Sequence, residues 1–358
     1  MYDIPILMLH TVNNKPQENP MGVLSVSAEG LEAYLKVFKA WKYQMISMDD
    51  LIRGNYNHDQ NFVVLTFDDG YKDNLTVALP VLKKYNARAT IFVNPAYCSE
   101  RSDDSNWGFM TWEEVKLAQT SGVFDIQAHT MTHAFIFTSD KVIDYYSPEK
   151  FTKYYWLAWM LYPEAPRHWD SKANQYRDRI PTGYPIFEYG RRIAQKQYIP
   201  NPKYIDFLMQ KHNGSCEDLC FAEEHGSYET TEEYERHVRW EIETCKKELE
   251  EILQKEIHTI CFPGGGYTDY ALKIAEECGY KCYMTASRKR IGNNNDHVEL
   301  LKKGSFVGLN RTAFSLIHPG ILPDAFFDYW LAKLSLGTYQ NKPVYKFMKK
   351  LLSKVLHT

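Results

Sequence analysis

Short apolar stretches that alternate with segments of helical periodicity constrain the fold of this chain most strongly. Seven stretches have the length and the β-branched content of buried strands: 4–9, 62–67, 89–93, 124–128, 258–262, 282–286 and 304–309. Helical segments are expected at 27–41, 73–85, 111–119, 231–249 and 268–279. Repeated strand–helix units build a parallel sheet covered by helices. The pattern predicts an α/β fold, a (β/α) barrel one strand short of eight, with an open doubly wound sheet as the competing architecture.

Residues 134–230 interrupt this alternation. The interval is rich in Tyr, Trp, Pro and charged residues, has helical stretches such as 151–161, and shows no clear strand repeat. Nearly a hundred residues is too long for a simple loop in a compact domain. We expect a barrel from 1–133 and 231–330, a helical insertion at 134–230 that caps the barrel rim, and a helical C-terminal tail at 331–358.

Composition excludes some classes of protein. The formal net charge of -3 argues against a nucleic-acid surface, which needs an excess of Lys and Arg. Seven irregularly spaced cysteines fit a reducing compartment better than a disulfide framework. The N-terminus has no basic region followed by a cleavage site, and no run of eighteen apolar residues occurs. These features predict a cytoplasmic protein.

Reactive residue types follow the predicted strands. The carboxyl ends of parallel barrel strands form one face, where reactive groups gather. The residues at these ends are His10, Asp68, Asp69, Gly70, His129, His133, Pro263, Gly264 and Arg311. One carboxylate and two imidazoles are good ligands for zinc and leave a position open for water. A second carboxylate nearby can act as a general base. Asp-Asp-Gly alone is often only a turn, but the combination at strand ends indicates a metal-dependent hydrolase.

Two sequence motifs resemble those of a known family. Thr66-Phe67-Asp68-Asp69-Gly70 and His129-Thr130-x-x-His133 are similar to the first two motifs of the polysaccharide deacetylases, which share the NodB-homology domain. The resemblance implies a distorted (β/α)7 barrel, with Asp68 as the base. It also implies that Asp69, His129 and His133 bind one divalent ion, with Zn favoured over Co, Ni, Fe or Mn. The resemblance covers about 1–133 and 231–311.

The general acid has two candidates. The N-terminal segment that ends in Leu9-His10 resembles the biofilm poly-N-acetylglucosamine deacetylase branch, which implies that His10 is the acid. A late Leu-x-His motif often supplies the acid in the family, and Leu316-Ile317-His318 matches it. We favour His10, because His318 follows the last predicted strand and precedes a proline.

The third family motif differs in this chain. The family often has Arg-x-Pro-Tyr-Gly, whereas this chain has Cys261-Phe262-Pro263-Gly264-Gly265 and lacks the arginine that orients the base. We hypothesise that Arg311 replaces that arginine. The Gly264 N–H is the expected oxyanion donor, and Pro263 and Tyr267 are expected beside the substrate.

The resemblance implies removal of an acetyl or other N-acyl group from an amino sugar, in a glycan or in a lipid-linked or nucleotide-linked precursor. Two alternatives stay open: hydrolysis of a non-sugar amide at the same metal site, and glycan binding by a degenerate site. Residues 343–358 form a basic amphipathic helix. We expect this helix either to pack on the barrel or to contact a membrane surface.

Overall fold

The computed structural model describes residues 3–13, 25–98, 108–165, 175–214, 220–285, 290–313, 324–340 and 342–356. His318, one candidate for the general acid, lies outside these ranges. Within them, no helix is both long enough and apolar enough to cross a bilayer.

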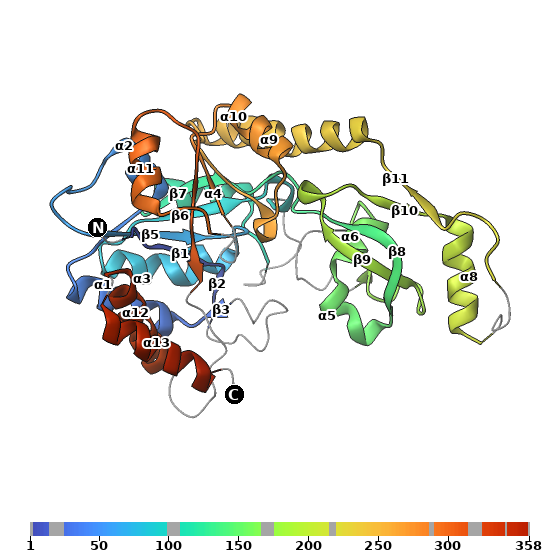
Figure 1. Cartoon of the computed structure of the whole chain (residues 1–358), viewed down its shortest axis with the longest axis horizontal. Helices are drawn as coiled ribbons and strands as arrows, with labels where there is room; N and C mark the ends of the chain where they lie inside the picture. The colour runs from blue at the N-terminus through green and yellow to red at the C-terminus, as the bar shows by residue number, and fades with distance from the viewer. Residues whose placement is uncertain are drawn as a thin grey trace.

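A parallel sheet forms the centre of the molecule (Figure 1). It contains the seven predicted strands: β1 (Ile6–Leu9), β5 (Phe62–Phe67), β6 (Ala89–Val93), β7 (Phe124–Ala128), β12 (Thr259–Cys261), β13 (Cys282–Met284) and β14 (Val307–Leu309). The strand order is β14-β13-β12-β7-β6-β5-β1-β15. At one edge of the sheet β14 pairs with β13, and at the other edge β15 (Thr312–Ala313) pairs with β1. Because β15 begins only three residues after β14 ends, one short segment of chain joins the two edges of the sheet. The result is a nearly closed barrel, which confirms the predicted fold over the open sheet.

Some strand bounds differ from those predicted. The last strand begins at Val307 rather than at residue 304, because Gly304 adopts a left-handed turn conformation with φ of 87°. The three-residue strand β4 (Gln44–Ile46) pairs with β5 and was not predicted. It is too short for the alternation of apolar and polar residues to be recognised. The short strands β2 (Thr11–Val12) and β3 (Ser25–Val26) pair outside the main sheet.

Helices surround the barrel: α1 (Ala28–Ala40), α2 (Met48–Arg53), α3 (Leu79–Lys84), α4 (Trp112–Thr120), α9 (Thr231–Leu253), α10 (Asp269–Glu277) and α11 (Asn294–Lys302). Ser27, Thr111 and Thr268 cap the N-termini of three of them, as their sequence positions predicted. The helix expected at 73–85 is divided into a π-helical turn, Asn74–Ala78, and α3. Pro80 lies at the start of α3, where its missing N–H breaks the regular hydrogen-bond ladder.

The insertion is not simply helical, and this part of the prediction was wrong. Its longest feature is an antiparallel pair, β8 (Phe135–Tyr145) and β9 (Pro185–Arg191). Shorter elements complete it: α5 (Phe151–Tyr154), α6 (Trp156–Leu161), β10 (Tyr198–Pro200), α8 (Pro202–His212) and β11 (Gly226–Tyr228). Register shifts at Val142 disturb the β8–β9 pairing, so a two-residue alternation does not run through the strand sequence.

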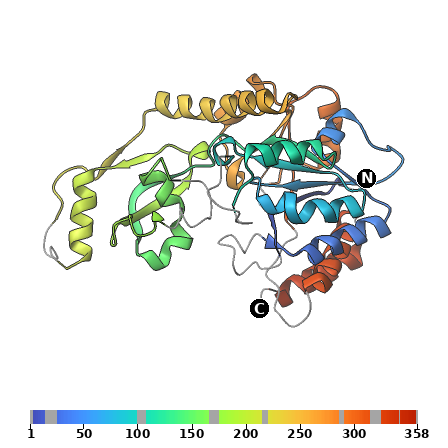
Figure 2. The same ribbon diagram turned by 180° about the vertical axis from the view of Figure 1, so that it is seen from behind.

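The insertion has an aromatic core of its own, separate from the barrel core, that includes Phe137, Tyr154, Trp156 and Phe187. It extends outward from the end of the barrel where the strands finish (Figures 1 and 2). Its first strand directly continues the loop that carries His133, so the insertion is attached at the predicted metal site.

The C-terminal helices lie against α1. Helix α12 (Asp324–Tyr339) packs on α1, where the Tyr34 hydroxyl donates a hydrogen bond to the buried Asp328 carboxylate. Helix α13 (Pro343–Leu356) packs on α12. The helical tail expected from residue 331 therefore begins at residue 324, and α12 belongs to the helical layer around the barrel.

Candidate metal centre

Asp69, His129 and His133 meet at the carboxyl ends of β5 and β7. The Asp69 Oδ1 atom lies 3.1 Å from His129 Nε2 and 3.2 Å from His133 Nε2. The ligating atoms of these three buried residues all lie within 4.8 Å of one another. One carboxylate and two imidazole nitrogens fit a zinc-like divalent ion, with room for water as a further ligand. The predicted ligand set is therefore assembled in the structure.

The backbone that carries these ligands is strained. Asp69, Thr130 and His133 have positive φ angles of 72°, 64° and 52°, which non-glycine residues rarely adopt. The Asn94 side-chain amide donates to the His129 carbonyl, and to the Thr130 carbonyl at 3.0 Å, so it holds this turn in place. Such local strain persists only where surrounding structure enforces it, and it is typical of functional sites.

A hydrogen bond at Nδ1 orients the His129 ring. Its Nδ1 atom lies 2.7 Å from the Cys261 carbonyl oxygen, which can only accept, so Nδ1 carries the proton. Nε2 is then the ring nitrogen that faces Asp69 and can bind a metal. This arrangement, in which a backbone carbonyl fixes the tautomer, is common for metal-binding histidines.

His133 has a different partner. Its Nδ1 atom lies 2.8 Å from Nη1 of Arg191, the last residue of β9. A guanidinium only donates, so His133 Nδ1 accepts here. Burial and the Arg191 charge hold the pKa of His133 well below its usual value, so the ring is neutral. Arg191 was not predicted, because nothing in the sequence indicated which insertion residues reach the barrel.

Asp68 lies beside this group and contacts a buried arginine. Arg311 Nη1 donates to Asp68 Oδ1 at 2.6 Å, and His10 Nε2 lies 3.8 Å from Asp68 Oδ2. Burial alone would raise the pKa of Asp68, but the charges of Arg311, His129 and His10 together lower it below its ordinary value. Asp68 is therefore an ionised carboxylate, as a general base must be before it accepts a proton.

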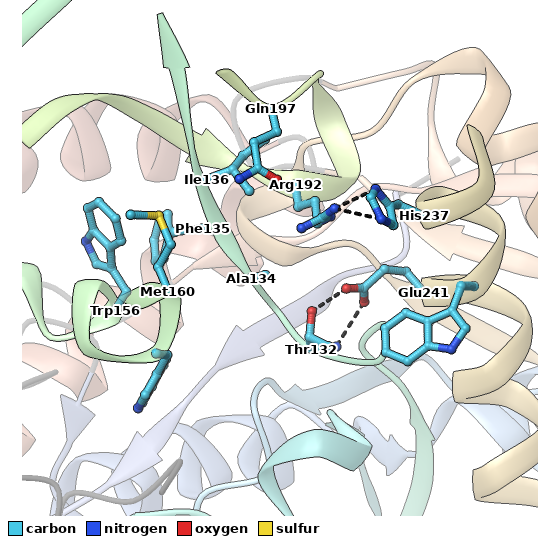
Figure 3. A pocket seen from close by; sticks show the side chains of 12 residues that line it. Thr132, Ala134, Phe135, Ile136, Trp156, Met160, Arg192, Gln197, His237 and Glu241 are labelled. Atoms are coloured by element: carbon cyan, nitrogen blue, oxygen red, sulfur yellow. Dashed lines mark hydrogen bonds between the residues drawn. The ribbon is translucent and has the colours of Figure 1, made fainter. Parts of the chain in front are cut away.

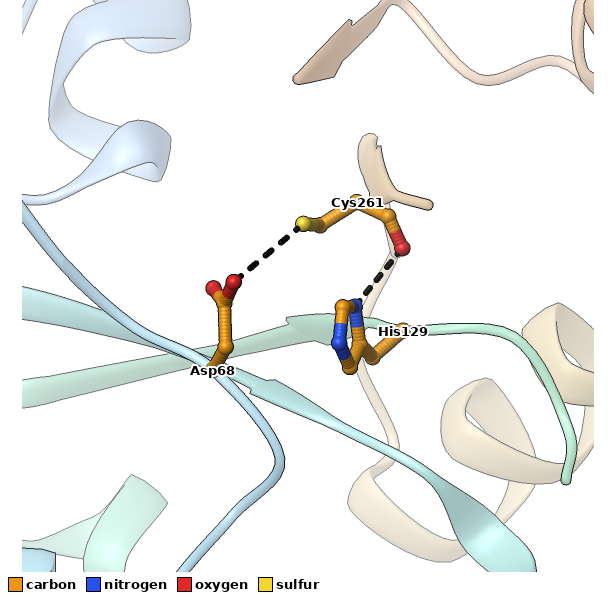
Figure 4. A group of neighbouring side chains, drawn as sticks. All are labelled: Asp68, His129 and Cys261. Carbon is orange, nitrogen blue, oxygen red and sulfur yellow. Dashed lines mark hydrogen bonds between the residues drawn. The ribbon is translucent and has the colours of Figure 1, made fainter. Parts of the chain in front are cut away.

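Cys261, at the end of β12, occupies the position where the family often has arginine. Its thiol lies 3.8 Å from Asp68 Oδ2, and its carbonyl oxygen accepts from His129 (Figure 4). Asp68, His129 and Cys261 thus form a second cluster of metal-ligand types. Burial raises the pKa of the Cys261 thiol, which disfavours the thiolate that binds metals. Since Asp68 is also paired with Arg311, the Asp69 group is the better metal site.

The other predicted site residues lie in and just after the turn that follows β12. Gly264 has φ of 61° in the turn Pro263–Gly265, and Pro263 is buried at the start of that turn. The Tyr267 ring packs against Phe262 and Tyr283, with centroids 5.5 and 5.3 Å away. Tyr267 therefore contacts barrel aromatics, and its expected role beside the substrate stays a prediction.

Aromatic rings from the barrel and the insertion line the outer side of His133. The Tyr97 ring centroid lies 6.0 Å from that of His133 and 5.6 Å from that of Trp159 in α6. Tyr71 and Phe109 belong to the same cluster. Burial raises the pKa of the neighbouring Tyr155 to about 12, so this phenol stays protonated. Since Tyr71, Tyr97 and Phe109 are buried, this cluster packs the insertion against the barrel beside His133.

A cavity of about 320 Å³ lies where the insertion meets α9. Its lining includes Trp156, Trp159, Trp240, Arg192, His237 and Glu241 (Figure 3). The Thr132 backbone N–H and side-chain hydroxyl both donate to Glu241, and Arg192 donates to His237. Thr132 precedes His133, so this cavity shares a wall with the metal group.

The structure thus defines a nearly closed parallel barrel with a candidate Asp-His-His metal site at its strand ends. The family model of the polysaccharide deacetylases matches residues 55–154 and 212–283, which include Asp68, Asp69, His129, His133, Cys261 and Gly264. The chain therefore carries a domain of the polysaccharide deacetylase family, as its motifs predicted.

The similar proteins include one curated relative and several solved structures. YxkH of Bacillus subtilis, which carries a provisional assignment as a polysaccharide deacetylase, is 30% identical over 133 residues. That match covers 36% of this chain and 43% of YxkH, so less than half of the relative's length is spanned.

Two solved structures are similar in fold. A de-N-acetylase from Aggregatibacter actinomycetemcomitans is 17% identical, with a TM-score of 0.52, over 87% of this chain and 95% of that one. The BpsB deacetylase domain from Bordetella bronchiseptica is 16% identical, with a TM-score of 0.51, over 87% and 96%. At these identities the likeness establishes the barrel fold.

Proposed function

We propose that this protein is a metal-dependent hydrolase that removes an acetyl or other N-acyl group from an amino sugar. One observation carries the proposal: Asp68 stands beside the Asp69–His129–His133 group, and Arg311 keeps it ionised. A carboxylate that is close to a metal but paired elsewhere is suited to be a base rather than a ligand.

Asp69, His129 and His133 would hold the ion, with Zn favoured over Co, Ni, Fe or Mn. When bound, a divalent ion acidifies water and polarises the acyl carbonyl. Asp68 accepts the proton of the attacking water, and the buried Arg311 keeps its carboxylate oriented. The Gly264 N–H stabilises the developing oxyanion. His10, 3.8 Å from Asp68, gives a proton to the departing amine. His318 remains the alternative acid.

The proposed substrate is an amino-sugar glycan, or a lipid-linked or nucleotide-linked precursor. The tryptophan-lined cavity beside Thr132 supports a sugar, since it offers aromatic faces near polar groups. The early His10 supports a relationship with the biofilm deacetylase branch. Together these features favour a glycan over a small amide.

We also propose peripheral contact with a membrane, and a cytoplasmic site of action at its surface. Four apolar side chains on one face of α13 are exposed: Val344, Phe347, Met348 and Leu351. Lys346 and Lys350 lie on other faces of the same helix and are exposed as well. The first turn of α13 is anchored to the rest of the protein, because Tyr345 packs on Trp41 with ring centroids 5.8 Å apart. An exposed apolar face with nearby lysines suits reversible binding to anionic lipid.

The test is acetate release from metal-loaded protein. The wild type should release acetate from N-acetylated oligosaccharides and much less from short non-sugar amides, and Asp68→Asn should release almost none from either. Release from the amides alone would favour the non-sugar alternative. Glycan binding without release would favour the degenerate binding protein.

A further inference from the structure

Arg191 places a permanent positive charge beside the metal group, and it comes from the insertion rather than from the barrel. Its guanidinium donates to His133 Nδ1 at 2.8 Å and to the His133 carbonyl at 3.3 Å. It lies over the Phe135 ring, with Cζ 3.5 Å from the centroid. The side chain is therefore held between β8 and the loop that carries a metal ligand.

The same guanidinium reaches the oxyanion turn. A Cβ atom built on Gly264 would lie 3.5 Å from Arg191 Nε and 3.7 Å from its Cγ. Arg191 thus spans the gap between His133, after β7, and the turn Pro263–Gly265, after β12. A substrate whose acyl group enters between these two segments would have Arg191 at its side.

Arg191 has no acidic partner. Among the residues that the structure describes, no carboxylate lies within ion-pair distance of its guanidinium. The next residue, Arg192, lines the cavity near α9, where Glu229 and His237 contact it. Burial lowers the pKa of the Arg191 guanidinium, and the nearby tyrosines and the Asp69 carboxylate oppose this only in part. A partly buried, unpaired arginine at a binding site is suited to an anionic ligand.

The geometry around His133 separates Arg191 from the reacting atoms. His133 Nε2 faces Asp69 at 3.2 Å, whereas Nδ1 faces Arg191. The two nitrogens point away from each other, so the guanidinium lies across the imidazole ring from the metal ligands. It is placed to hold a flanking part of the substrate rather than the acyl oxygen.

We propose that Arg191 is a positioning residue that binds a carboxylate or phosphate carried by the amino-sugar substrate close to its N-acyl group. This inference rests on the proposed function and narrows it to acidic amino sugars. A histidine that binds metal through Nε2 carries its proton on Nδ1 and cannot accept from Arg191. With a metal held by His133, the guanidinium would therefore be available to a substrate anion.

The test compares three probes: N-acetylglucosamine 1-phosphate, N-acetylmuramic acid and neutral N-acetylglucosamine. Binding is followed by ligand-observed NMR titration of metal-loaded Asp68→Asn protein, in which turnover is blocked. At least one anionic probe should bind about tenfold or more tightly than the neutral probe, as for a charge-assisted hydrogen bond worth about 1.5–3 kcal/mol. The two anionic arms distinguish phosphate from carboxylate.

Adding Arg191→Gln should abolish the preference for the anionic probe, and Arg191→Lys should restore part of it. Arg177→Gln, at an exposed arginine of the insertion that pairs with Asp178, is the control and should keep the wild-type preference. Metal content is measured in every variant. Equal binding of all three probes to the protein with Arg191 intact would overturn the proposal. Equal weakening of all three by Arg191→Gln, together with metal loss, would also overturn it, because Arg191 would then only support His133.

Acetate release by the wild type is scored separately. A preference for the anionic probes without acetate release would retain the Arg191 site and reject the deacetylase function. Acetate release without such a preference would retain the deacetylase function and reject the Arg191 site.

Discussion

Arg311 and Asp68 are 243 residues apart in the sequence and form a buried ion pair, with Nη1 2.6 Å from Oδ1. Arg311 follows the last long barrel strand, whereas the arginine of the usual third motif would stand at Cys261. A positive charge beside the proposed base Asp68 is thus present although it comes from a different sequence position, because neighbouring strand ends can direct side chains to the same point.

Replacing Arg311 tests this relationship. Arg311→Gln should lower kcat/KM by about a hundredfold or more, because a buried carboxylate loses its charged partner. Since Arg311 lowers the pKa of Asp68, its removal should raise that pKa and move the acidic limb of the pH–rate profile to higher pH. The profile is measured on metal-loaded protein. Arg290→Gln, which breaks an exposed pair with Asp3, should leave the limb in place.

The general acid is tested on the alkaline side of the same profile. An acid must be protonated to act, so activity should fall as it loses its proton. His10→Ala should remove that alkaline limb and slow turnover while the metal is retained. His318→Ala should leave the limb intact. The opposite pattern would transfer the role to His318 and weaken the relationship with the biofilm branch.

Asp73 provides a pH-dependent test of stability. It is buried, and burial raises its pKa to about 8, so the folded protein keeps this proton where the unfolded chain, with a pKa of about 3.9, has lost it. The contribution to stability is full below about pH 4 and declines as the pH rises towards 8. Asp73→Asn should therefore gain in Tm relative to the wild type between pH 6 and pH 9. A Tm difference that is equal at both pH values, as expected for the exposed control Asp59→Asn, would contradict the raised pKa.

The exposed face of α13 predicts lipid binding. The protein should co-sediment with anionic vesicles, less with neutral ones, and less at high salt. Phe347→Glu combined with Leu351→Glu should lower the bound fraction severalfold without changing the Tm, because both side chains are more than half exposed. Leu117→Glu, at a similarly exposed leucine on α4, is the control. Equal sedimentation of all these proteins would refute the membrane contact.

The sequence predicted the residues of the metal group because parallel strands bring their carboxyl ends to one face. The prediction of Asp69, His129 and His133 as one group needed only that rule and two sequence motifs. Arg191 could not be predicted in this way, since it lies in the insertion and its contact with His133 depends on the β8–β9 pair. That pair was itself missed, because its register shifts interrupt the alternation of the strand residues. The Arg311 hypothesis was available because its strand was predicted, although its distance to Asp68 was not.

The central claim is that Asp68 acts as the base whereas Asp69 binds the metal. Metal content measured together with acetate release tests this claim most directly. Asp68→Asn should retain close to one divalent ion per chain and lose nearly all acetate release from an N-acetylated glycan. Asp69→Asn should lose both the ion and the activity. If Asp68→Asn loses the metal while Asp69→Asn keeps it, or if Asp68→Asn remains fully active, the account is contradicted.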